Sequence, residues 1–224
     1  MPLIVLEGLD GAGKTTQTEL LKERLESRGL RYEYLHFPRF DAPVYGGLIA
    51  RFLRGELGAS MPWTHTSSPS FRGRPGRCGR DDTEWLARGK YVLLDRYVNS
   101  NIAYQCAKVE GGEAREMLRR WILDLEYGHN AIPRPDVSLF LDVPFRFTER
   151  SLTAPRRGAD RGYLGGADDI HEASLAFQRR VREIYLGLAE EGELEVVDCR
   201  DEKGDMCPPQ RVFARITEKM EGIL

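Results

Sequence analysis

Five short runs of mostly apolar or alternating residues recur along the chain, and stretches with helical periodicity separate them. The runs are Leu3 to Leu6, Arg31 to Phe37, Val92 to Leu94, Val137 to Leu141 and Leu194 to Val197. Strands that alternate with helices in this way are typical of a parallel sheet with helices on both faces. The pattern therefore predicts an α/β fold of three layers, built around a five-stranded parallel sheet.

The intervening stretches predict the covering helices. They span Thr16 to Arg28, Tyr45 to Gly55, Gly111 to Asn130, Phe145 to Leu152 and Asp168 to Glu190. In the third of these, Met117, Trp121 and Leu125 recur every four residues, and such a stripe is typical of a helix packed on a core. We therefore expect these three side chains to be buried.

Length and composition narrow the class of protein. At 224 residues the chain fits one domain, or one domain with a small mobile insert. Charged residues make up 30% and the net charge is −2, so charge alone favours neither nucleic acid nor a membrane surface as a partner. No apolar run has the length of a membrane span, and the chain enters its first strand without a leader. We expect a cytoplasmic protein in which the four cysteines, without paired spacing, are reduced thiols.

A glycine-rich loop lies between the first predicted strand and the first helix. Its sequence, GLDGAGKT, fits the phosphate-binding pattern of Gly, four residues, Gly, Lys and Thr. Glycines let successive N–H groups point at phosphate oxygens, and the helix adds its positive end. Lys14 is expected to reach the β and γ phosphates of ATP, and Thr15 to hold Mg²⁺. The residues expected at the donor nucleotide are Gly8, Leu9, Asp10, Gly11, Ala12, Gly13, Lys14, Thr15 and Thr16. The alternative, a turn that binds nothing, does not explain the register of strand, loop and helix.

Charged residues follow the second and third predicted strands. The second strand runs into Phe37-Pro38-Arg39 and the third ends in Asp95-Arg96. Ligands of open parallel sheets bind at the carboxyl ends of the strands. Asp95 is therefore expected to hold the Mg²⁺ shell through water, and Arg96 to clamp phosphate with its planar fork. An ordinary surface arginine at position 39, and a plain ion pair at the end of the third strand, are the alternatives.

Several of these segments together resemble the thymidylate kinases. They are the loop with Asp10 inside it, Phe37-Pro38-Arg39, the run from Asp95 to Gln105, Pro135-Asp136, Leu139 to Pro144 and the arginine-rich stretch that follows. The similarity covers nearly the whole chain outside residues 60–82, and it is more specific than the phosphate loop alone. It implies a homodimeric kinase that transfers the γ-phosphate of MgATP to dTMP, giving dTDP and ADP on the route to dTTP.

The resemblance also implies roles for individual residues of the acceptor site. Asp10 corresponds to a loop acid that contacts the 3′-hydroxyl of the acceptor and helps to organise Mg²⁺. Arg39 and Arg96 correspond to arginines on the acceptor phosphate, and Tyr104 to a residue that disfavours a ribose 2′-hydroxyl. The residues implied around the acceptor nucleotide are Asp10, Phe37, Arg39, Arg96, Ser100, Asn101, Tyr104 and Gln105. An ordinary polar helix surface would also carry residues such as those from 100 to 105.

Residues 153–167 form an arginine- and glycine-rich segment between two predicted helices. From Thr153 to Gly166 there are three arginines and four glycines, which predicts a hinged cationic lid. Phosphoryl transfer spreads negative charge over the transferred group, so an arginine brought onto it lowers the barrier. Some thymidylate kinases, the family that the chain resembles, carry this arginine in the phosphate loop, at the position that Gly11 occupies here. We therefore expect Arg157 or Arg161 to supply the charge, with a solvated basic loop as the alternative.

Residues 60–82 do not fit the pattern of the rest of the chain. Between 61 and 80 there are four arginines, three prolines and no acid, whereas the remainder has net charge −6, from 29 basic and 35 acidic residues. The thymidylate kinases, which the chain resembles, have a thymine-contacting helix at the position of this segment. The codons that residues 61 to 80 require can spell such a helix in shifted frames, and three single-base losses would restore the original frame by Asp81. We expect this stretch to be a frame-shifted reading and to be irregular.

Two rival functions stay open at this point. One is a kinase for another nucleoside monophosphate or deoxynucleoside monophosphate. The other is a nucleotide-binding protein without turnover, which the disrupted helix would explain. A panel of acceptor substrates at fixed ATP distinguishes a dTMP kinase from a kinase for another nucleotide. Tight ATP binding without ADP release in the presence of dTMP would favour the nucleotide-binding protein.

Overall fold

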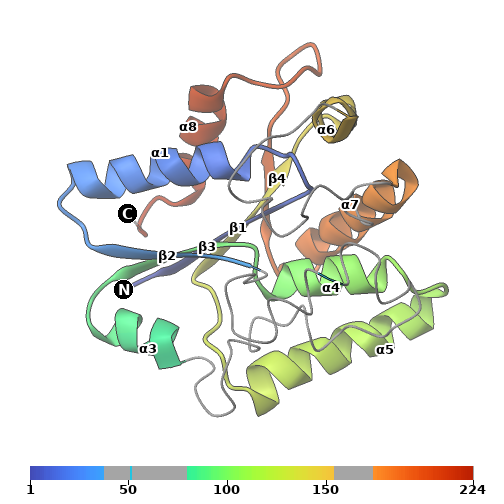
Figure 1. Cartoon of the computed structure of the whole chain (residues 1–224), viewed down its shortest axis with the longest axis horizontal. Helices are drawn as coiled ribbons and strands as arrows, with labels where there is room; N and C mark the ends of the chain where they lie inside the picture. The colour runs from blue at the N-terminus through green and yellow to red at the C-terminus, as the bar shows by residue number, and fades with distance from the viewer. Residues whose placement is uncertain (38–50, 52–79, 154–173, 224) are drawn as a thin grey trace.

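The computed structural model describes residues 1–37, 51, 80–153 and 174–223. Its centre is a parallel sheet of five strands in the order β2-β3-β1-β4-β5 (Figure 1). The strands are β1 (Leu3–Gly8), β2 (Tyr32–His36), β3 (Tyr91–Asp95), β4 (Val137–Asp142) and β5 (Glu195–Asp198). All five strands predicted from the sequence are confirmed, as is their parallel arrangement.

Helices cover both faces of this sheet. They are α1 (Lys14–Ser27), α3 (Arg80–Ala87), α4 (Val98–Cys106), α5 (Gly112–Leu123), the π-helical turn η1 (Asp124–His129), α6 (Phe145–Thr153), α7 (Leu175–Glu190) and α8 (Pro209–Lys219). Helices α1 and α8 lie side by side on one face, and α4 packs between α5 and α7 on the other (Figure 1). The three-layer architecture expected from the sequence is thus confirmed for the described residues.

Alternation along β1 explains the two cores. Leu3 and Val5 pack in the cluster under α4 and α7, while Ile4 and Leu6 pack in the cluster under α1 and α8. All four side chains are at most 3% exposed. Successive side chains of a strand point to opposite faces, so a central strand buried on both faces is mostly apolar. This double burial holds the carboxyl end of β1 firmly in the middle of the sheet.

Helix α5 corrects one expectation. Met117 is 67% exposed and Trp121 41% exposed, whereas Ile122 is fully buried. Leu118 packs with Ile122 against the core, so the buried face is the one a single position further along the helix. The predicted packing of Met117 and Trp121 in the core was wrong, because an apolar repeat of four residues does not tell which side of the helix meets the core.

Helix α7 carries arginines in two different environments. Its described portion begins at Leu175. Arg179 and Arg180 are exposed, as a solvated face requires. Arg182 instead donates two hydrogen bonds, of 2.6 and 2.8 Å, to the carboxylate of Asp142, which is only 2% exposed. This forked ion pair ties α7 to the end of β4.

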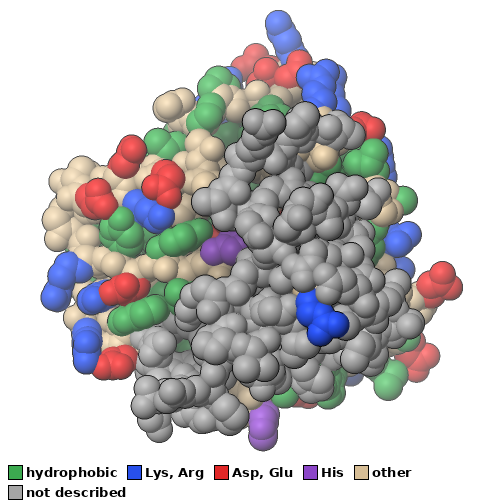
Figure 2. Space-filling model, viewed as in Figure 1, with side chains coloured by type: hydrophobic (Ala, Val, Ile, Leu, Met, Phe, Trp, Pro, Cys, Tyr) green, Lys and Arg blue, Asp and Glu red, His purple; other side chains and the backbone are tan. Residues whose placement is uncertain are grey.

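Several predicted features lie outside the described residues. These are Arg39, the helix Tyr45 to Gly55 apart from the helical Arg51, the irregular stretch up to residue 79, the lid from residue 154, and with it Arg157 and Arg161. Each of them stays a prediction. On the described part of the face seen in Figure 2, acidic and basic side chains are interspersed.

Two further observations concern the described residues as a whole. None of the helices placed within 1–37, 80–153 and 174–223 combines the length and the apolar character that crossing a bilayer needs. Cys106, Cys199 and Cys207 are buried free thiols, as predicted for three of the four cysteines.

Candidate active site

The phosphate loop connects β1 to α1 with two left-handed glycines. Gly11 and Gly13 have φ angles of 74° and 82°, a conformation that residues with a side chain rarely adopt. At Gly8, a Cβ atom would lie 3.3 Å from Cβ of Ala12 and 3.6 Å from Cβ of Leu141. No side chain caps the start of α1, where Gly13 is the N-cap. The first N–H groups of α1 are therefore left for a ligand, and an anion at a helix N-terminus is the ligand that suits them.

Lys14 is buried beneath this loop. Its Nζ donates hydrogen bonds to the carbonyl oxygens of Gly8 and Leu9, at 3.4 and 3.1 Å. Nζ also lies 3.9 Å from Oδ1 of Asp95, and on the other oxygen His36 Nδ1 lies 3.2 Å from Asp95 Oδ2. The loop lysine and the acid at the end of β3 thus form one buried charged group.

A second charged group joins the loop acid to the end of β3 and to α4. Arg96 Nη2 lies 2.5 Å from Asp10 Oδ1 and 3.2 Å from the Tyr104 hydroxyl. The Tyr104 hydroxyl donates a 2.7 Å hydrogen bond to Asp10 Oδ2, and Gln178 Nε2 donates one of 3.0 Å to the same oxygen. Arg96 Nη1 also donates to Ser100 Oγ at 3.0 Å. Residues predicted from three separate segments therefore meet at one point.

The main chain at Arg96 is strained. Its φ angle is 68°, in the left-handed region that residues other than glycine, asparagine and aspartate seldom occupy. The Arg96 N–H donates a 2.9 Å hydrogen bond to the Leu6 carbonyl oxygen, which extends the pairing of β3 with β1 by one residue. Such strain clusters at functional sites, where surrounding contacts hold it.

Burial and neighbouring charges shift the pKa values of Asp10, Asp95 and Lys14. Burial alone would raise the pKa of Asp10, but Arg96 and then Lys14 hold it well below its usual range. The pKa of Asp95 is likewise lowered: burial opposes the shift, and Lys14 and His36 outweigh burial. Burial, followed by the charge of Arg96, lowers the pKa of Lys14. Both acids are thus kept as carboxylates in an enclosed site, where they can hold cations.

The four predicted residues of α4 are all buried. Ser100, Asn101, Tyr104 and Gln105 are between 3% and 9% exposed. The Tyr104 ring packs under the Arg96 guanidinium, with its centroid 4.9 Å from Cζ. Phe37 is also buried in the core, and its ring centroid lies 6.1 Å from that of Tyr97. Thr15 and Thr16 are exposed at the start of α1.

Three buried polar residues of the site were not predicted. Gln178 and Tyr185 project from α7, where Gln178 contacts Asp10 and Tyr185 donates to Glu7 Oε2 at 2.9 Å. Glu7 lies on β1 and is fully buried. An acid inside an otherwise apolar strand was a signal that could have found Glu7, because a buried carboxylate needs donors. Gln178 and Tyr185 carried no comparable local signal.

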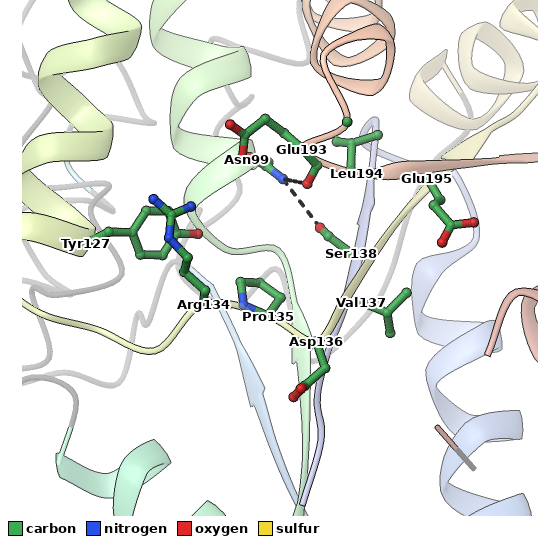
Figure 3. Close-up of a pocket in the computed structure, with 11 residues that line it drawn as sticks. Asn99, Tyr127, Arg134, Pro135, Asp136, Val137, Ser138, Glu193, Leu194 and Glu195 are labelled. Carbon is green, nitrogen blue, oxygen red and sulfur yellow. Dashed lines mark hydrogen bonds between the residues drawn. The ribbon is translucent and has the colours of Figure 1, made fainter. Parts of the chain in front are cut away.

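A hollow of about 270 Å³ opens elsewhere, at the amino ends of β4 and β5 (Figure 3). Tyr127, Arg134, Asp136 and Glu193 are among its lining residues, and the Arg134 guanidinium lies 4.1 Å from the centroid of the Tyr127 ring. The predicted site residues that the structure describes do not line it. It lies at the opposite edge of the sheet from the phosphate loop.

Comparisons with known proteins agree with the fold and the loop. A family described as thymidylate kinase matches residues 6–60 and 82–206. A thymidylate kinase from Mycobacterium tuberculosis is 33% identical over 193 residues, which are 85% of this chain and 86% of that protein. A probable thymidylate kinase from Pyrococcus horikoshii is 34% identical over 190 residues, covering 84% of this chain and 82% of that one.

A solved structure shares the architecture. The thymidylate kinase from Candida albicans matches with a TM-score of 0.70 at 24% sequence identity, and the match covers 99% of this chain and 91% of that chain. The similarity therefore extends to the order and direction of the helices and strands.

Proposed function

Because the chain belongs to the thymidylate kinase family, we propose that it transfers the γ-phosphate of MgATP to dTMP, giving dTDP and ADP. The observation that carries the proposal is the contact of Arg96 with Asp10 and Tyr104, directly beside a phosphate loop whose helix start has no capping side chain. In this proposal the donor site and the acceptor site share one wall of charged residues.

The donor triphosphate would lie on the loop from Gly8 to Thr15. The N–H groups at the start of α1 would point at its oxygens, together with the positive end of the helix dipole. Lys14 now donates to two carbonyl oxygens of its own loop. We propose that Nζ exchanges these neutral acceptors for β and γ phosphate oxygens when ATP binds, because hydrogen bonds between charged partners are the stronger ones.

The acceptor would lie along α4. Arg96 would hold its phosphate with a planar fork, and Asp10 would contact the sugar hydroxyl through the oxygen that Tyr104 and Gln178 now occupy. Tyr104 would stand against a 2′-hydroxyl and so favour a deoxyribonucleotide. Arg39 and Phe37 are proposed partners of the acceptor from the end of β2. Ser100, Asn101 and Gln105 complete the proposed wall.

The residues present fit a magnesium ion. Asp95 Oδ1 is buried, and among the described residues none donates a hydrogen bond to it. The Thr15 hydroxyl is exposed at the start of α1. Thr15 would bind Mg²⁺ directly, Asp95 would accept hydrogen bonds from its water shell, and Asp10 would add negative charge. When bound, the ion neutralises charge on the transferred phosphate.

The chain's own cations would supply the remaining stabilisation. Lys14 and Arg96 would each place a positive charge beside the transferred phosphate, and we propose that Arg157 or Arg161 completes this charge from the lid. Catalysis would then consist of positioning and charge stabilisation without a covalent enzyme intermediate. We also propose a cytoplasmic homodimer, on the strength of the family resemblance.

We further propose that residues 61–80 are a frame-shifted reading of the thymine-contacting helix. The family match supports this, since it leaves out residues 61–81 and resumes at 82. Resequencing the DNA from Gly58 to Trp85 tests it, and a well-supported open frame as printed would reject it. If the frame is shifted, the chain encoded by the corrected DNA should have a lower KM for dTMP than the chain printed here.

The activity is tested by coupled ADP release at fixed ATP with dTMP, dUMP and dCMP as acceptors. We expect dTMP to be the best substrate, and Lys14→Ala to lower kcat roughly a thousandfold. A clear preference for another acceptor would replace dTMP in the assignment. Tight ATP binding without ADP release from the wild type would instead identify a nucleotide-binding protein.

A further inference from the structure

Glu7 is a fully buried carboxylate that the proposed chemistry does not use. It lies on β1, one residue before the phosphate loop, and is 0% exposed. Its Oε1 accepts hydrogen bonds from the main-chain N–H groups of Tyr97, at 3.0 Å, and Ser100, at 3.3 Å. Its Oε2 accepts the Tyr185 hydroxyl at 2.9 Å. A carboxylate with three donors from two other elements must fix those elements relative to β1.

These bonds cap helix α4 from another strand. Tyr97 is the N-cap residue of α4 and its own side chain makes no capping bond. In a capping box, the side chain of the N-cap residue accepts the main-chain N–H of the third helical residue. The side chain of that third residue accepts the main-chain N–H of the N-cap residue. Glu7 accepts from both positions here, and its negative charge faces the positive end of the helix.

The capped segment is the one that carries Arg96. Arg96 precedes Tyr97 and has a left-handed main chain, while its side chain donates to Ser100 Oγ. Glu7 therefore binds the main-chain N–H of Tyr97, which follows Arg96, and that of Ser100, whose hydroxyl Arg96 contacts. A carboxylate with this geometry can maintain the strained backbone that aims the guanidinium at Asp10.

We propose that Glu7 is a positioning residue for the acceptor phosphate, acting through the start of α4 and through Arg96. The proposal rests on the proposed function, since Arg96 is the assigned phosphate clamp. Glu7 itself touches neither nucleotide in this scheme. Its loss should therefore disturb dTMP more than ATP.

The positioning role of Glu7 depends on its negative charge and therefore on pH. Burial raises its pKa to about 7, although Arg96, the Tyr185 hydroxyl, the Tyr97 N–H and Lys14 all favour the carboxylate. The groups that face it are Arg96 from the end of β3, Lys14 from α1, Tyr97 and Ser100 from α4, Tyr185 from α7 and, more remotely, Tyr127 from η1. Glu7→Gln reproduces the shape of the protonated form, so wild type and variant should behave alike at low pH and differ at high pH.

The test measures kcat and the KM values for dTMP and ATP in Glu7→Gln, Glu7→Ala and the matched control Asp136→Asn. Asp136 also accepts a main-chain N–H, that of Leu3 at the other end of β1. We expect the KM for dTMP to rise about threefold in Glu7→Gln and about tenfold in Glu7→Ala, with little change in the KM for ATP. Asp136→Asn should leave both KM values unchanged.

A pH series separates positioning from simple stabilisation. We expect the ratio of kcat/KM for dTMP, wild type over Glu7→Gln, to rise from near one below pH 6 to a plateau above pH 8. The phosphate of dTMP itself titrates near pH 6, and its effect cancels in the ratio. In a Tyr185→Phe background the midpoint should move to higher pH, since the Tyr185 hydroxyl lowers the pKa of Glu7.

Three results would overturn the proposal. They are a ratio that does not vary with pH, equal increases in the two KM values, and a Glu7→Gln enzyme that differs from wild type only in its unfolding transition. Wild-type turnover of dTMP decides the proposed function separately. If that turnover fails, calorimetric dTMP binding by the same variants still tests Glu7.

Discussion

Both ends of β1 are held by a carboxylate that accepts a main-chain N–H, yet the two ends differ in chemistry. At the amino end, Asp136 Oδ2 accepts from the Leu3 N–H at 2.7 Å, and Asp136 is exposed beside the hollow in Figure 3. At the carboxyl end, Glu7 accepts from Tyr97 and is fully buried. Water screens the first carboxylate, whereas the second interacts with Arg96 and Lys14 at low local dielectric.

The difference shows that burial, and not residue type, sets the electrostatic environment of a polar contact. Arg134 at the amino end stacks on Tyr127, and Arg96 at the carboxyl end stacks on Tyr104. Arg134 is exposed, whereas Arg96 is 7% exposed and is paired with the half-buried Asp10. The same pair of residue types can thus be tested in both environments.

The largest expected difference is in kcat, between a cation at the phosphate loop and a cation at the opposite edge of the sheet. Lys14→Ala should lower kcat roughly a thousandfold, because one preorganised charge at the transferred phosphate is lost. Arg134→Ala, at the opposite edge of the sheet, should leave kcat within about twofold, as a surface substitution does. Steady-state ADP release measures both variants. Equal losses in the two would mean that the phosphate site is not at the carboxyl end of β1.

The next effect concerns stability and its dependence on pH. The pKa of Glu7 is raised from 4.5 to about 7 in the folded chain, so the folded state keeps the proton to higher pH than the unfolded state. The resulting stabilisation is complete below pH 4.5 and is lost as pH rises through 7. Relative to Glu7→Gln, the free energy of unfolding of the wild type should fall by about 3 kcal/mol across this range.

Urea unfolding at pH 5, 6, 7 and 8 measures this difference. Asp136→Asn is the matched control at the exposed end, and its difference from wild type should stay constant over the series. A constant difference for Glu7→Gln as well would show that Glu7 does not titrate in this window.

A smaller difference in kcat/KM for dTMP is expected between Tyr104 and Tyr127, the two tyrosines that stack on these arginines. Tyr104→Phe removes the hydroxyl that donates to Asp10 and accepts from Arg96, and kcat/KM for dTMP should fall about tenfold. Tyr127→Phe should leave kcat/KM unchanged, since the ring that contacts Arg134 is kept. Initial rates at subsaturating dTMP measure both. If Tyr104→Phe keeps wild-type rates, the Tyr104 hydroxyl does not orient Asp10.

The smallest effect is at Asp136. Asp136→Asn keeps an acceptor for the Leu3 N–H but loses its charge, so the free energy of unfolding should fall by about 1 kcal/mol or less. Thermal unfolding with dTMP and without it makes the comparison, and the shift caused by dTMP should equal that of the wild type. A weaker shift in the variant would connect the amino end of β1 to the nucleotide site.

The sequence predicted the strands and the phosphate loop because their signals are local. A strand buried on both faces is mostly apolar, and the loop needs glycines and a lysine at fixed spacing. Helix α8 was not predicted, although Val212 and Ile216, four residues apart and both fully buried, were a usable signal. The buried side of α5 could not be predicted, because it depends on how the helix meets the rest of the core.

The contacts that complete the site had no local signal. The sequence motifs selected Asp10 and Arg96 from two separate segments, and the structure brings these two residues together. Gln178 and Tyr185 meet Asp10 and Glu7 across 168 and 178 residues, a distance that no periodicity encodes. Glu7 itself looked like one polar residue in an apolar strand, and only the packing of α4 and α7 reveals its donors.

These two long-range contacts have a consequence for biosynthesis. Glu7 and Asp10 are translated 178 and 168 residues before Tyr185 and Gln178, their partners on α7. At about 5–20 residues per second, the nascent chain carries both carboxylates without these donors for roughly ten to forty seconds. During that interval nucleotides in the cell cannot protect the growing chain through a finished pocket. The ribosome must deliver most of the chain before ligand binding can begin to favour the folded state.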